Sequence, residues 1–106
     1  MRTLINLSLL LCVSAVSGMA ADAKAGKAVY DRACKMCHGA DGTPNPAIVK
    51  MTQVQMQDLK GPEVQGMSDA DLKTIITDGK GKMKPVKTVT GADADNVVAF
   101  IRTLKK

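Results

Sequence analysis

Aromatic side chains are nearly absent from this sequence. Its 106 residues include one Tyr, one Phe and no Trp. A chain of this length is enough for one small domain, in which buried side chains alone are a limited source of stability. Because only Tyr30 and Phe100 can supply rings, we expect something else to fill the centre of the fold.

Histidine and cysteine are also scarce. His38 is the one histidine, and the cysteines are Cys12, Cys34 and Cys37. A structural zinc site needs four ligands, and the sequence offers no second cluster of Cys and His to complete one. This scarcity argues against a zinc-bound domain.

The sequence has no apolar run long enough to span a membrane. Its longest, residues 4–16, has about 13 residues, whereas a spanning helix needs about 20. Arg2 before this run and the small residues Gly18 and Ala20 after it are typical of a cleaved export signal, which we favour over an uncleaved anchor. We predict a signal peptide over residues 1–20, one mature domain over residues 21–106 and a periplasmic location.

Acidic residues are outnumbered, so the mature domain is basic. Without Arg2, 14 Lys and Arg stand against 10 Asp and Glu, a net charge of +4. Lys80, Lys82, Lys84 and Lys87 fall within eight residues that contain no acid. Such a run is most often a solvated loop, but it can also steer an acidic protein partner. Nucleic acid is not an expected partner, because no aromatic residues are interleaved with the basic ones.

Helical patterns cover most of the mature chain, and no alternating strand pattern is present. The first predicted helix covers residues 22–33, with Asp22 as its N-cap. A second clear pattern covers residues 68–78, and the last helix begins near Thr90 and runs to the end of the chain. Residues 47–59 are weakly helical. The sequence therefore predicts an all-α domain of three or four helices.

Residues 34–38 read Cys-Lys-Met-Cys-His, the C-x-x-C-H signature for covalent attachment of a c-type haem. Two cysteines separated by two residues can bond the two vinyl groups on one edge of a porphyrin, and the next residue then presents an imidazole to the iron. We predict that Cys34 and Cys37 hold one haem c and that His38 is an iron ligand. The haem would also fill the centre of the fold.

The cysteine pair has two other interpretations. A thioredoxin-like redox pair also uses C-x-x-C, but a strand precedes it and a helix opens at its first cysteine, whereas here a predicted helix precedes the pair. The second alternative is a simple disulfide between Cys34 and Cys37. The histidine directly after the pair, together with the export signal, favours haem attachment.

Residues 22–105 as a whole resemble the class I c-type cytochromes of bacteria. Gly26 and Tyr30 are similar to the glycine and the aromatic residue of that family's first helix, and Phe100 is similar to the aromatic of the last helix. The resemblance implies a small cytochrome c fold around one haem, in which the last helix crosses the first. It also implies that a backbone carbonyl near a proline turn, here residues 44–46, fixes the axial histidine.

The same resemblance implies a loop methionine as the second iron ligand. Met83 lies in a lysine-rich loop just before the last helix, where the family places its axial methionine, so we predict that Met83 binds the iron. Met51 is the alternative, although Met51 and Met56 fit better as core residues. One departure is that Lys84 separates Met83 from Pro85, where relatives often have Met-Pro directly.

With both axial positions filled, the iron has no open site for a substrate. The sequence therefore predicts one-electron transfer by a monohaem c-type cytochrome in a respiratory or related chain, and not enzymatic catalysis. We expect a monomer whose redox protein partners carry an acidic docking patch. The alternatives are an open-site haem enzyme or ligand sensor, and a fixed subunit of a larger redox complex.

Overall fold

The computed structural model describes residues 21–105, and in this part of the chain all regular elements are helices, with no strand. Its elements are α1 (Ala23–Ala33), α2 (Lys35–His38), α3 (Pro46–Thr52), α4 (Pro62–Gln65), α5 (Asp69–Asp78) and α6 (Ala92–Thr103). The predicted all-α fold is confirmed, and the single-turn helices α2 and α4 add to the helices expected from the sequence. The predicted signal peptide lies outside the described residues.

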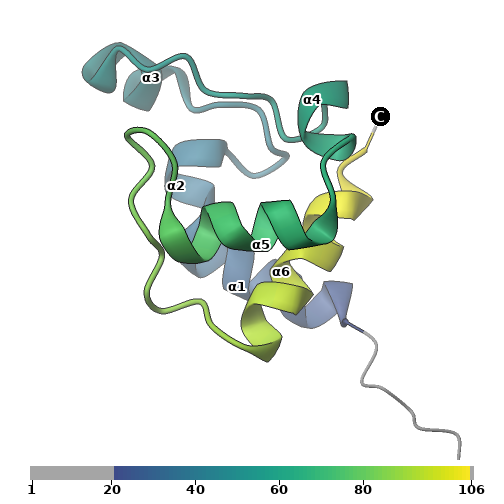
Figure 1. Ribbon diagram of the computed structural model, residues 1–106. Coiled ribbons are helices and arrows are strands. Elements are labelled where there is room, and N and C mark those ends of the chain that lie inside the picture. Colours follow the sequence, from purple (N-terminus) through teal and green to yellow (C-terminus); the bar gives the residue numbers. More distant parts are fainter. Residues whose placement is uncertain (1–20, 106) are drawn as a thin grey trace, which may run out of the picture.

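No helix between residues 21 and 105 is long and apolar enough to cross a membrane. Helices α1, α5 and α6 pack together, and α3 stands apart from them at the top of the view (Figure 1). The loop after α5, drawn in green, rises on the side where α3 lies (Figure 1). The long helices thus form one side of the molecule, and the loops around α3 form the other.

Helix α1 begins as the sequence predicts. The Asp22 carboxylate accepts hydrogen bonds from the N–H groups of Lys24 and Ala25, which satisfies two donors that the helix itself cannot pair. Its buried face consists of Gly26, Val29 and Tyr30. This face meets α6, and the last turn of the helix delivers the chain to Cys34.

Gly26 allows α1 and α6 to cross in close contact. A Cβ atom at this position would lie 1.8 Å from the backbone oxygen of Asn96. The Asn96 side chain also accepts a hydrogen bond of 2.8 Å from the N–H of Asp22. The implied crossing of the first and last helices is therefore present, and glycine is the residue that permits it.

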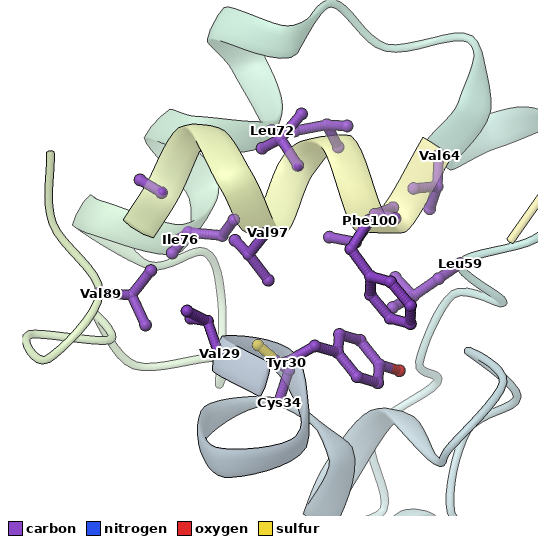
Figure 2. Packing of buried hydrophobic residues seen from close by; sticks show 13 residues of the cluster. Val29, Tyr30, Cys34, Leu59, Val64, Leu72, Ile76, Val89, Val97 and Phe100 are labelled. Atoms are coloured by element: carbon purple, nitrogen blue, oxygen red, sulfur yellow. The ribbon is translucent and has the colours of Figure 1, made fainter. Parts of the chain in front are cut away.

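The core has only two rings, and they lie against each other. Tyr30 and Phe100 have ring centroids 4.9 Å apart and planes tilted by 54°, within the range that aromatic pairs favour. Figure 2 shows the two rings between the α1 and α6 ribbons, with Leu59 beside them. The remaining buried residues are aliphatic apart from one cysteine: Val29, Cys34, Val64, Leu72, Ile76, Val89, Ala94, Val97, Val98 and Ile101.

One predicted boundary is close and another is wrong. The last helix begins at Ala92, two residues after Thr90, because Gly91 has a φ of 54° and forms the N-cap without a side-chain hydrogen bond. Residues 47–59 do not form one helix. Helix α3 ends at Thr52, because Gln53 adopts a left-handed φ of 53°. The chain then continues without helical structure to residue 61.

Candidate functional site

A cavity of about 480 Å³ lies between the long helices and the loops around α3. Ligand sites commonly have volumes of about 300–1,000 Å³ and mostly apolar walls. The walls here are mainly aliphatic side chains and methionines: Ile48, Val54, Met56, Leu59, Val64, Met67, Leu72, Ile75, Ile76, Met83 and Ile101. The cavity therefore suits a large apolar group rather than a small polar substrate.

The predicted attachment residues line this cavity together. Helix α1 stops at Cys34, whose backbone (φ −122°, ψ −33°) separates it from the single turn of α2. Residues three and four apart share one face of such a turn, so Cys34, Cys37 and His38 all face the same space. All three border the cavity. This arrangement would allow the two thiols to hold a porphyrin edge and the imidazole to reach its iron.

Both cysteines are free thiols. Burial, together with the nearby Cys37, raises the pKa of Cys34 to about 11. A thioredoxin-like pair works through a thiolate with a lowered pKa, so the surroundings of Cys34 do not suit that chemistry. No disulfide joins Cys34 and Cys37, so both sulfur atoms are available for thioether bonds.

His38 is in a form that can bind a metal. Burial lowers the pKa of its imidazole, so the ring is neutral at pH 7, as a ligand must be. The buried Nδ1 atom has no hydrogen-bond partner among the described residues. The carbonyl expected from the turn at residues 44–46 is thus not in place, and that expectation is not confirmed.

Tyr30 connects α1 to the end of α2, the turn that contains Cys37 and His38. Its hydroxyl donates a hydrogen bond of 2.6 Å to the Gly39 oxygen and a longer one of 3.4 Å to the His38 oxygen. Burial raises the pKa of Tyr30, so the hydroxyl keeps its proton and remains a donor. The sequence identified the ring of Tyr30 but not this role of the hydroxyl, which helps to fix the backbone of His38.

Asn45 is a second residue that the sequence analysis missed. Its side chain donates to the Met36 oxygen at 3.0 Å and accepts from the Ala47 N–H, while its own N–H donates to the Cys37 oxygen. It therefore caps α3 and joins it to α2. The signal was available, because Asn directly before Pro at the start of an apolar segment is typical of a helix N-terminus.

Met83 borders the cavity from a tight turn. The N–H of Lys80 bonds the Met83 oxygen, and the N–H of Met83 bonds the Lys80 oxygen, at 2.9 and 3.0 Å. Gly79 and Gly81 permit the turn, with φ values of 80° and 58°. A Cβ atom on Gly79 would lie 2.6 Å from the Met83 oxygen. The loop geometry therefore depends on glycine on both sides of Lys80.

The other methionines differ in their positions. Met56 and Met67 also line the cavity. Met51, the alternative ligand from the sequence, is 74% exposed and does not border it, so its expected place in the core is wrong. Met36 is 73% exposed. The methionines that face the predicted haem site are therefore Met56, Met67 and Met83.

The lysine run lies at the edge of this cavity. Lys80 and Lys82 border it, and Lys84 and Lys87 are exposed nearby in sequence. Within residues 21–105, none of the four forms an ion pair. The cations that do are Lys27, Arg32, Lys60, Lys73 and Arg102. The side of the molecule with the Met83 loop therefore carries uncompensated positive charge.

Comparison with known proteins agrees with this geometry. Residues 21–101 match the family described as cytochrome c oxidase, cbb3-type, subunit III, and the chain belongs to this family of c-type cytochrome domains. It is 32% identical to cytochrome c-554(547) of Halothiobacillus neapolitanus in an alignment of 92 residues that covers 81% of this chain and all of that protein. The solved structure of the KustC0563 c-type cytochrome matches with a TM-score of 0.65 and 27% identity, over 76% of this chain and 98% of that one.

The protein is thus a c-type cytochrome with a covalently bound haem c, as the sequence predicted. The residues present fit this group. Two adjacent free thiols and a neutral imidazole lie on one side of an apolar cavity, and a thioether lies in the loop that borders it. Cys34 and Cys37 are the residues that can hold the porphyrin, and His38 is the residue that can hold its iron.

Proposed function

We propose that this protein is a periplasmic carrier of single electrons, with the haem iron bound between His38 and Met83. The observation that carries the proposal is that these two side chains border one cavity from separate segments, the α2 turn and the loop after α5. A haem iron with these two ligands cycles between the ferric and ferrous states, and the thioether raises its reduction potential.

The chain contributes to this function in two ways. Apolar walls on α5, α6 and the segment after α3 exclude water, which favours the iron state of lower charge. The core beneath them is buried and aliphatic apart from Cys34, Tyr30 and Phe100, so it supports these walls without placing a charged group under the site. Neither contribution requires a catalytic acid or base, which agrees with the presence of a single histidine in the sequence.

Met83→Ala should abolish the methionine-to-iron charge-transfer band at the red edge of the oxidised spectrum. The reason is that alanine cannot supply a thioether at this position. Met56→Ala and Met67→Ala are matched controls, because both methionines line the same cavity. Each should keep the band. If the band persists in Met83→Ala and disappears in one of the controls, that other methionine is the ligand.

A fixed place in a larger redox complex is the second candidate. It is favoured by the family match, whose description names a subunit of an oxidase. Purification from native membranes distinguishes the two. A carrier is recovered alone after a wash at high salt, whereas a fixed subunit remains with its complex. An open-site enzyme or sensor would instead show high-spin iron that binds carbon monoxide readily.

The unpaired lysines support the proposed type of partner. Lys84 and Lys87 are exposed, and Lys80 and Lys82 border the cavity that holds the haem. A positive surface beside a redox centre orients an acidic partner and raises the association rate more than the final affinity. We therefore propose an acidic redox protein as the partner.

Lys84→Glu combined with Lys87→Glu should slow oxidation of the reduced protein by hexacyanoferrate(III), an anionic oxidant, by about tenfold at low salt. The same variant should react faster with a cationic cobalt phenanthroline complex. The differences should shrink as ionic strength rises, because screening acts over about 10 Å at ~0.1 M salt. Stopped-flow spectroscopy measures both reactions.

The matched control replaces Lys24 and Lys105 with Glu. Both lysines are exposed, neither borders the cavity, and neither forms an ion pair among the described residues. This variant has the same net charge as the Lys84, Lys87 variant and should react like the wild type. Equal rates for the two variants would mean that the lysine run is an ordinary solvated loop.

A further inference from the structure

One side chain ties the Met83 loop to the opposite wall of the cavity. Lys82 Nζ donates a hydrogen bond of 3.1 Å to the backbone oxygen of Thr52, 30 residues earlier in the chain. Thr52 is the last residue of α3, and both residues border the cavity. The bond therefore joins the two segments that enclose this side of the site.

The Thr52 oxygen is free to accept this bond because α3 ends there. The last carbonyl groups of a helix have no partner within it, and a cation is favourable at that end. Gln53 turns the chain out of the helix with its left-handed φ, and its N–H bonds the Val49 oxygen. Lys82 thus provides a cap for α3 from a distant part of the sequence.

No other hydrogen bond between residues 21 and 105 joins the tip of the loop to this wall. Within the tip, the backbones of Lys80 and Met83 bond only each other, and the Val86 N–H bonds the Ile76 oxygen on α5. The facing segment is also loosely held, because no N–H of residues 54–58 donates a hydrogen bond. Among the residues that the structure describes, the Lys82 bond is therefore the only hydrogen bond across this part of the cavity.

We propose that Lys82 is a positioning residue that holds the Met83 loop against α3 and so keeps the thioether of Met83 at the iron. This inference rests on the proposed axial role of Met83. Without the bond, the loop tip is held only from its α5 side, and an external ligand competes better for the axial position. Lys84 offers a matched comparison, because it follows Met83, is exposed, makes no hydrogen bond in the described chain and does not border the cavity.

The test measures the affinity of the ferric holoprotein for imidazole, which binds only where the methionine has left the iron. Lys82→Met should raise this affinity about three- to tenfold, the range expected for loss of one hydrogen bond from a charged donor at an exposed site. Lys84→Met loses the same charge and should keep the wild-type affinity. Lys82→Arg keeps the charge and the donors and should restore it. The thermal midpoint of Lys82→Met should fall by no more than the loss of this one bond explains, roughly 4–8 °C, whereas a general loss of stability would lower it further.

Equal imidazole affinity in Lys82→Met and Lys84→Met would overturn the positioning role. The same conclusion follows if Lys82→Arg binds imidazole as tightly as Lys82→Met, or if the thermal midpoint of Lys82→Met falls by clearly more than roughly 4–8 °C. A different measurement would show that Met83 is not an iron ligand. In that case the ferric spectrum of the wild type lacks the methionine-to-iron band, and the positioning role of Lys82 fails together with the assignment of Met83.

Discussion

A double variant with Cys34→Ser and Cys37→Ser should lose all of its haem on extraction with acid and acetone, and its intact mass should equal that of the bare polypeptide. The wild type should keep the added mass of one haem, because thioether bonds resist this extraction. Both bonds are expected because α2 and its N-cap Cys34 present the two thiols to the same cavity. Serine keeps the size of cysteine but cannot form the bonds.

The same variant should give little folded protein. A domain near this size rarely gains more than about 3–5 kcal/mol from its own core, and an empty cavity of about 480 Å³ leaves its wall without contacts on one side. Bound haem stabilises only the folded state. Thermal unfolding followed by circular dichroism tests this expectation.

The single variants supply the control. Cys34→Ser and Cys37→Ser each leave one thioether bond, so each variant should keep haem that resists extraction, at a reduced yield. If haem leaves the wild type with the solvent, covalent attachment is wrong. If the double variant folds as stably as the wild type, then the haem contributes less to the fold than the small core implies.

Gly26→Ala should lower the free energy of unfolding of the holoprotein by about 3 kcal/mol, the upper end of the usual cost of overpacking. In a domain of this size that corresponds to a fall in the thermal midpoint of roughly 12–24 °C. The cause is the backbone oxygen of Asn96, which lies 1.8 Å from the position of the new methyl group. Because this neighbour is backbone, α1 and α6 must move apart to relieve the clash.

Ala28→Gly, two residues further along α1, is the matched control. Ala28 is exposed, so only the helix preference of alanine is lost, at about 1 kcal/mol or roughly 4–8 °C. Helix preference alone would make Gly26→Ala stabilising. A thermal midpoint for Gly26→Ala at or above that of the wild type would show that the crossing adjusts without cost.

The attachment site was predictable because it is local. Cys34, Cys37 and His38 lie within one helical turn, so their spacing in sequence fixes their relation in space. The start of α1 was predictable for the same reason, since the Asp22 cap acts on donors two and three residues away. Such short-range relations do not depend on the rest of the fold.

The opposite wall of the site was less accessible to sequence reasoning. A helix continued through residues 47–59 would have placed Met51 and Met56 differently, but the left-handed Gln53 ends it. Met56 then borders the cavity, while Met51 faces solvent. The Lys82 bond to Thr52 depends on the same ending. These features follow from how distant segments meet, which a single sequence does not reveal.

The close contact of α1 with α6 also bears on the order of events during synthesis. Helices α1 and α6 are the first and last helices in sequence order, so their contact joins residues that are far apart in the chain. Asp22 and Asn96, which share a hydrogen bond, are separated by 74 positions. Contacts between distant residues form slowly, because a long loop must close first. A nascent chain that lacks residues 92–103 leaves the Tyr30 face of α1 uncovered. The domain is therefore finished only when its last helix arrives.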